Sequence, residues 1–137
     1  MPDYAAIQER LLRIPTFQTL QYRVDRFGQG VATMTAPYAK AYDGIFESFH
    51  GGMLMTLADS CACAAIMTLT GPDAMLTTTD MNIRFLAPAR SDVTADAQIV
   101  KFGRTLVPVA VSLRDADGKE VAVAQVTYMR LGTASSH

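Results

Sequence analysis

The chain has little excess charge of either sign and lacks the usual signals for nucleotide binding. Its 137 residues include 12 Lys and Arg and 13 Asp and Glu, a formal net charge of −1, and no Lys/Arg-rich run occurs. Nucleic acid is therefore not expected as a main partner. No Walker-type or dinucleotide-binding glycine pattern is present, so no nucleotide cofactor is predicted.

Thiols and imidazoles, the usual metal ligands, are also scarce. Cys61 and Cys63 lie two apart in a segment predicted to be helical, where side chains at that spacing point in different directions. The histidines are His50 and the terminal His137, which give no ligand set at zinc-like spacing. We therefore expect neither a metal site nor a disulfide, and interpret both cysteines as small, buried apolar residues.

Residues 1–4 lack the basic and apolar regions of a secretory signal, so we expect a cytoplasmic protein with reduced thiols. Residues 51–72 could span a bilayer by length, since their only charge is Asp59. That carboxylate lies mid-segment, where insertion costs about 2.5–3.5 kcal/mol, and no Lys/Arg cluster flanks the segment. A helix buried on all sides by protein is the better interpretation, with no membrane partner.

The periodicity predicts a single α+β domain over residues 1–137, without repeats or linkers. Helical spacing indicates a short amphipathic helix at about 3–14, ended by Pro15, and a long apolar helix at about 51–70. Alternation predicts about six strands, with runs near residues 20–25, 31–36, 81–85, 93–99, 106–113 and 121–130. Short turns favour an antiparallel sheet wrapped around the long helix.

Two local features qualify this pattern. Pro108 lies inside one of the runs, and proline is typical of edge strands or bulges. The tail, about residues 133–137, is predicted to be disordered.

The start of the long helix carries the residues that indicate chemistry. Gly51 and Gly52 allow close approach to the backbone, where the N–H groups of a first helical turn attract negative charge. Thioester hydrolysis requires such donors for the oxyanion that forms from the carbonyl. Asp59, about two turns further on, can activate a water as general base or attack the carbonyl to form a mixed anhydride.

The run His50-Gly51-Gly52, followed by Leu57 and Asp59, resembles the HGG…LxD motif of PaaI-type (phenylacetic acid degradation) thioesterases of the hotdog superfamily. Two later segments are similar to the family in the same order: DMNIRFLAPA at residues 80–89 and KFGRT at residues 101–105. The resemblance covers roughly residues 48–105. It implies a hotdog fold and hydrolysis of an acyl- or aryl-CoA to free acid and CoA, with no separate cofactor.

The resemblance also implies roles for individual residues. The Gly51 N–H would polarise the thioester carbonyl, Asp59 would be the base or nucleophile, and Thr78 would hold water, with Thr77 as a neighbouring alternative. His50 would organise the loop before the helix and, with Gly52, border the substrate. Many relatives have an Asn six residues before the histidine, where this chain has Gly44.

Cations suited to the CoA phosphates are available near these segments. The candidates are Arg84, Arg90, Lys101 and Arg104. Two other functions stay open: a hotdog hydratase or dehydratase, which would use His50 beside a carboxylate, and a non-catalytic acyl-CoA-binding module.

Helix geometry predicts that the site is shared between two chains. Gly51 and Asp59 are eight residues apart, about 12 Å along a helix axis. A base must come within about 3 Å of the group on which it acts, so one chain's Gly51 and Asp59 would not serve the same thioester. Two antiparallel helices about a twofold axis would bring them together, so we expect a homodimer, with a dimer of dimers as a further possibility.

Overall fold

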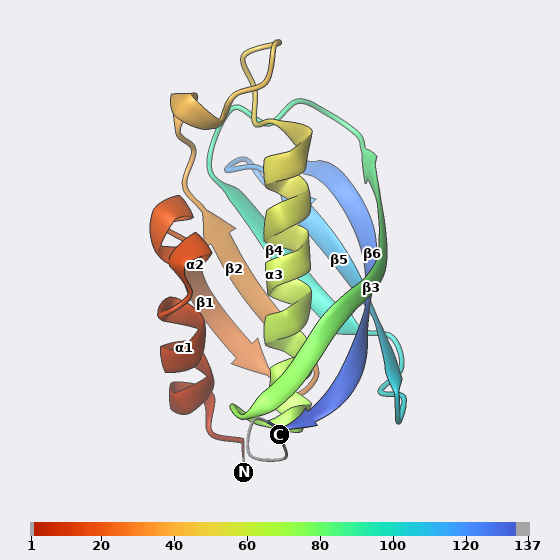
Figure 1. Cartoon of the computed structure of the whole chain (residues 1–137). Helices are drawn as coiled ribbons and strands as arrows, with labels where there is room; N and C mark the ends of the chain where they lie inside the picture. The colour runs from red at the N-terminus through yellow and green to blue at the C-terminus, as the bar shows by residue number, and fades with distance from the viewer. Residues whose placement is uncertain (1, 134–137) are drawn as a thin grey trace.

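A 20-residue helix, α3 (Gly51–Thr70), runs through the molecule, and a sheet curves around it (Figure 1). The computed structural model describes residues 2–133. The other elements, in chain order, are α1 (Tyr4–Leu12), α2 (Pro15–Leu20), β1 (Arg23–Gly28), β2 (Val31–Ala36), the 3-10 helix η1 (Lys40–Tyr42), β3 (Ala74–Phe85), β4 (Val93–Ile99), β5 (Leu106–Arg114) and β6 (Glu120–Thr133).

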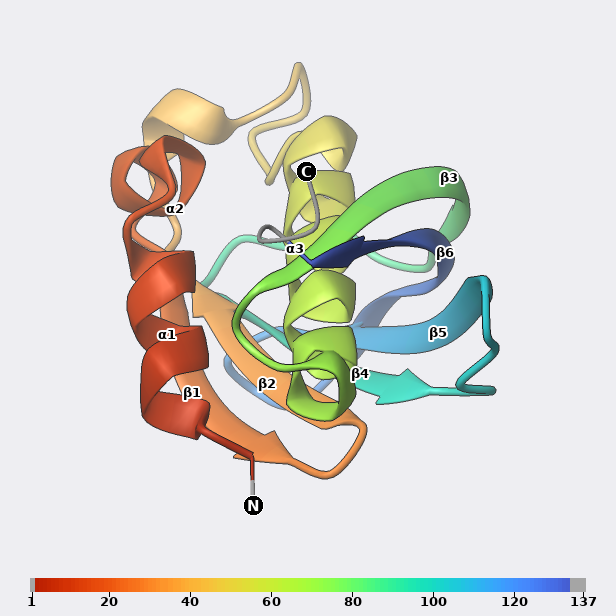
Figure 2. The ribbon, with the colours of Figure 1, turned by 60° about the horizontal axis from the view of Figure 1, so that its bottom comes forward.

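The six strands form one antiparallel sheet in the order β1-β2-β4-β5-β6-β3. Figure 2 shows the sheet curling around α3, with α1 and α2 beside β1. The antiparallel sheet wrapped around a long central helix, predicted from the sequence, is therefore confirmed. β3 and β1 form the two edges of the sheet.

The core lies between α3 and the inner face of the sheet. On β5 the buried side chains are Val107, Val109, Val111 and Leu113, which alternate with more exposed residues. Fully burying such a side chain contributes roughly 1.5–3 kcal/mol. The facing side of α3 is rich in small residues, namely Ala58, Cys61, Ala62 and Ala65. Small side chains let the strands approach the helix closely.

Cys61 is the buried residue that the sequence predicted. Its thiol lies 3.4 Å from the carbonyl oxygen of Ala32 on β2 and 3.5 Å from that of Ala95 on β4. Burial raises the pKa of this thiol strongly, so Cys61 is a neutral core residue.

The prediction that α3 is buried on all sides is wrong for one face. The sheet covers only one side of the helix, so a stripe made of Gly52, Thr56, Asp59 and Cys63 is only partly buried. Cys63 is therefore not the fully buried residue expected. The helix is long and apolar enough to cross a membrane by length and composition, yet 56% of its most apolar window is buried within the fold.

The N-terminal segment differs from the sequence prediction in its boundaries. The first helix begins after the N-cap Asp3 and ends at Leu12, and Pro15 starts α2 rather than only ending a helix. Proline fits a first helical position because no partner is needed there for a backbone N–H. Residues 20–22, expected in a strand, end α2 through a left-handed turn at Gln21 (φ 56°).

Two strands also differ from expectation. β3 begins at Ala74, well before the predicted residue 81. Pro108 lies in β5, which is an interior strand rather than an edge. Its carbonyl accepts a hydrogen bond from the Val100 N–H. Proline has no backbone N–H, and at this position an N–H would point to where β4 has already ended at Ile99. Apart from Thr133, the last residue of β6, the predicted disordered tail lies outside the described residues.

The turn before β5 provides a test of the fold. A Cβ at Gly103 would lie 2.1 Å from the carbonyl oxygen of Leu106. Because backbone must move to relieve this contact, Gly103→Ala should lower the free energy of unfolding by about 1–3 kcal/mol. Urea unfolding at fixed protein concentration measures the loss. Gly44→Ala is the control, since its nearest neighbour would be 3.6 Å away; equal losses in the two variants would contradict the structure.

Candidate active site

The site begins at the N-terminus of α3, where His50 is the N-cap residue. Its Nδ1 accepts a hydrogen bond of 2.9 Å from the Gly52 N–H, which assigns the proton of the neutral ring to Nε2. His50 therefore organises the start of the helix, in agreement with the role implied by the resemblance.

The Gly51 N–H is the donor that this cap leaves available. Within residues 2–133 it makes no hydrogen bond to protein, as is usual for a first helical residue. The helix dipole makes this end favourable for negative charge. A Cβ at Gly51 would lie 3.0 Å from the Phe85 ring at the end of β3. The same residues border a surface hollow of about 430 Å³, so glycine keeps this N–H close to open space.

Asp59 lies two turns further along, on the partly buried stripe of α3. The Thr78 hydroxyl on β3 donates a hydrogen bond of 2.8 Å to its Oδ1. The Tyr128 hydroxyl on β6 approaches the same oxygen at 2.8 Å and the Asp59 backbone carbonyl at 2.9 Å. No hydrogen bond to Oδ2 is found among the described residues. One carboxylate oxygen is therefore held by two hydroxyl groups, while the other remains available for chemistry.

Tyr128 has a hydroxyl that stays protonated. The residue is only 6% exposed, and burial raises its pKa well above the ordinary value, with Cys63 and Asp59 adding to the shift. The phenol is therefore a donor, not an anion, throughout the physiological range. The sequence analysis missed this residue. Its position on the apolar face of a predicted strand was the available signal, because a buried tyrosine hydroxyl needs a partner.

Cys63 is one helical turn beyond Asp59 on the same face of α3. Burial, reinforced by the nearby carboxylate of Asp59, raises the pKa of this thiol to about 11. The thiolate, not the thiol, is the nucleophilic form, so Cys63 is poorly suited to attack a thioester.

The structure does not bring all the predicted site residues together. Gly51 and Asp59 of one chain lie at different levels of α3, about 12 Å apart along the axis. Thr77 lies next to Thr78 on β3, where successive side chains point to opposite faces, and among the described residues no hydrogen bond joins it to Asp59. The four predicted CoA cations, Arg84, Arg90, Lys101 and Arg104, are all exposed.

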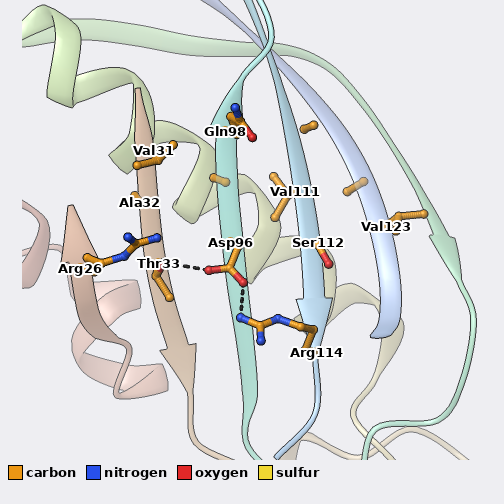
Figure 3. A pocket seen from close by; sticks show the side chains of 13 residues that line it. Arg26, Val31, Ala32, Thr33, Asp96, Gln98, Val111, Ser112, Arg114 and Val123 are labelled. Atoms are coloured by element: carbon orange, nitrogen blue, oxygen red, sulfur yellow. Dashed lines mark hydrogen bonds and ion pairs between the residues drawn. The ribbon is translucent and has the colours of Figure 1, made fainter. Parts of the chain in front are cut away.

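A larger hollow, of about 630 Å³, lies elsewhere, on the face of β2, β4 and β5 that points away from α3 (Figure 3). There Asp96 accepts a hydrogen bond of 2.8 Å from Thr33 and is paired with Arg114. A carboxylate engaged in this way is a poor base. Among the described residues no group of three His, Cys, Asp or Glu side chains is placed to hold a metal. The arrangement around Asp59 is therefore the better candidate.

Comparison with known proteins gives related sequences. The chain is 30% identical over 105 residues to a predicted esterase of Saccharolobus solfataricus, which covers 75% of this chain and 74% of that protein. It is 36% identical over 78 residues to acyl-coenzyme A thioesterase 13 of Mus musculus, which covers 55% of each.

Solved structures agree with the fold. A thioesterase family protein from Silicibacter pomeroyi is 28% identical with a TM-score of 0.87, covering 94% of this chain and 98% of that chain. The E. coli PaaI protein of the phenylacetic acid degradation operon is 20% identical (TM-score 0.87, 95% and 94% covered). A hypothetical thioesterase of Streptococcus pneumoniae, solved with coenzyme A, is 21% identical (TM-score 0.75, 82% and 87% covered). The last two similarities show the fold alone.

These similarities confirm the α+β hotdog fold predicted from the sequence. They support the superfamily but not the narrower PaaI-type group implied by the sequence motif, since the PaaI protein is one structural neighbour among several. A model of the thioesterase superfamily matches residues 46–122, which is more than half of the chain and includes Gly51, Asp59 and Thr78. On this match, and on its similarity to the S. solfataricus protein, the chain belongs to the thioesterase superfamily.

Proposed function

We propose that the protein is an acyl-CoA thioesterase that hydrolyses an acyl-CoA to the free acid and CoA. The observation that best supports this function is the state of the Asp59 carboxylate. Thr78 and Tyr128 hold its Oδ1, while Oδ2 is left available on the uncovered face of α3. The name of the mouse relative and the coenzyme A in the S. pneumoniae structure support CoA as the carrier of the acyl group. The HGG run and Asp59 support a PaaI-type arrangement of the site.

Two routes use the available Oδ2. As general base, Asp59 takes a proton from water while the oxygen of that water forms a bond to the carbonyl carbon. The C–S bond then breaks, and the sulfur leaves as CoA thiolate and is protonated. As nucleophile, Asp59 itself bonds to the carbonyl carbon and expels the thiolate, and water then hydrolyses the mixed anhydride. Thr78 and Tyr128 fix the carboxylate in the orientation that either route requires.

The oxyanion would be stabilised by Gly51 of a second chain. Gly51 lines the surface hollow at one end of α3, and Asp59 lies on the partly buried stripe further along. An antiparallel second α3 against this stripe places each Gly51 beside the partner subunit's carboxylate, giving two equivalent sites. β3 supports this dimer because it is a 12-residue edge strand whose residues 77–80 are exposed. Unpaired edges of this length are usually covered.

Exposed cations supply the means to bind the CoA phosphates. Arg84, Arg90, Lys101 and Arg104 are exposed, and none forms an ion pair with a described carboxylate. We propose that these four cations bind the phosphates as a group, because phosphate binding at the mouth of a site depends more on positive charge than on a single fixed geometry.

Replacing the carboxylate is the most direct test. Asp59→Asn keeps the size of the side chain but removes its basic oxygen, so thioester hydrolysis should fall by at least about a hundredfold. Release of free thiol from acyl-CoA measures the rate. Circular dichroism should show an intact fold, and calorimetric titration should show unchanged binding of CoA. Near-normal turnover in this folded variant would refute the assignment.

The Tyr128 hydroxyl is proposed to position Asp59. Tyr128→Phe should lower kcat by about ten- to a hundredfold, the effect of losing a hydrogen bond to a charged group, with little change in KM.

Tyr22→Phe is the matched control for that experiment. Its hydroxyl is buried and, among the described residues, has no hydrogen-bond partner. Removing it should leave kcat near the wild-type value. Equal losses of kcat in the two variants would show that Tyr128 acts on stability only.

A shared site can be tested by mixing two inactive variants. Asp59→Asn chains lack the base, and Gly51→Val chains carry a side chain that Phe85 and the substrate must avoid. A mixed dimer contains one site with both groups intact, so activity should return in part after subunit exchange. Exchange verified by mass spectrometry without any recovery, or a fully active monomer in sedimentation at assay concentration, would rule out the shared site.

A further inference from the structure

A third hollow, of about 90 Å³, lies between α1, α3 and β3. Its apolar walls come from three places: Leu11 and Ile14 at the end of α1 and the turn that follows, Cys63 and Met67 on α3, and Ala74 and Leu76 on β3. We call it the α1–α3 hollow.

The α1–α3 hollow continues from the Asp59–Thr78 hydrogen bond. Four residues of a helix advance about 6 Å, and two residues of a strand advance about 6.6 Å on the same face. Because α3 and β3 run in opposite senses, Cys63 and Leu76 form the next level beyond Asp59 and Thr78. Met67 and Ala74 form the level after that. The apolar walls therefore begin one step from the carboxylate.

Arg10 lines the α1–α3 hollow at the level of Ala74, away from Asp59. Its guanidinium donates hydrogen bonds to the carbonyl oxygens of Pro72 and of Ala74, the latter at 2.7 Å, and these bonds tie α1 to the start of β3. A group entering from the Asp59 end therefore meets apolar side chains first and a charged, hydrogen-bonded group at the end. This limits both the polarity and the length of what fits.

We propose that the α1–α3 hollow holds the acyl chain and makes the enzyme selective for short aliphatic acyl groups over longer and aromatic ones. This inference rests on the proposed thioesterase function. The small volume of the hollow is the basis of this selectivity. An apolar cavity of roughly 150 Å³ accepts benzene. The 90 Å³ of this hollow is smaller. A thioester whose carbonyl lies at Asp59 extends its chain between Cys63 and Leu76 towards Met67.

The test is a series of thioesters assayed by release of free CoA thiol: acetyl-, butanoyl-, hexanoyl-, octanoyl- and phenylacetyl-CoA. We expect kcat/KM to be highest for butanoyl-CoA and at least about tenfold lower for octanoyl- and phenylacetyl-CoA, as expected when methylene groups no longer fit a pocket. A flat series, or a preference for the phenylacetyl group, would overturn the inference.

Two variants should then shift the preferred acyl-chain length in opposite directions. Ile14→Ala removes part of the wall at a position that is 37% exposed, so the fold should tolerate it. This variant should shift the optimum towards octanoyl-CoA. Leu76→Phe fills the hollow and should shift it towards acetyl-CoA. Met129→Ala is the control, because Met129 follows Tyr128 on β6 and does not line the hollow; an equal shift in this variant would overturn the assignment.

A binding experiment separates this inference from the proposed function. Calorimetric titration of the Asp59→Asn variant with CoA and with butanoyl-CoA needs no turnover. Tighter binding of butanoyl-CoA, lost when Leu76→Phe is added, supports the acyl site even if the wild type hydrolyses none of the thioesters. Equal affinity for CoA and butanoyl-CoA would overturn the acyl site even if hydrolysis is observed.

Discussion

The packing of the small-residue side of α3 against a strongly curved sheet determines where everything else lies. Ala58, Cys61, Ala62 and Ala65 let the strands approach the helix closely, and the sheet then bends around one side of it. The opposite stripe is left partly open because the six-stranded sheet does not close on itself and covers only one side of the helix. Asp59 and Cys63 lie on this stripe, so the same packing that forms the core also leaves a carboxylate accessible.

The carboxylate on this stripe is stabilised by neutral donors rather than by a cation. A partly buried charge without partners costs several kcal/mol, and an ion pair would reduce its reactivity. Two hydroxyl groups on Oδ1 offer an intermediate arrangement, because they stabilise the charge without neutralising it. The additional contact between Tyr128 and the Asp59 backbone carbonyl joins β6 directly to the helix at this level.

The features that the sequence predicted well depend on local signals. Alternation along β4, β5 and β6 and the continuous apolar run of α3 indicated the sheet and its central helix, and the glycines after His50 indicated where that helix begins. The beginning of β3 escaped because residues 77–79 are three threonines without alternating hydrophobicity. Tyr128 escaped because it contacts Asp59 across 69 positions of the sequence, and only the order of the strands makes them neighbours.

The wall contributed by α1 has a bearing on how such enzymes diverge. The segment that matches the superfamily model begins at residue 46, so Arg10, Leu11 and Ile14 lie outside it, whereas Gly51, Asp59 and Thr78 lie within it. The proposed reacting groups thus lie within the matched segment, together with the walls that α3 and β3 contribute, while the wall contributed by α1 and the turn after it lies outside. Mutations in the first fifteen residues can remodel the hollow while leaving the reacting groups untouched, so a duplicated gene has a route to a new substrate range through its N-terminal segment alone.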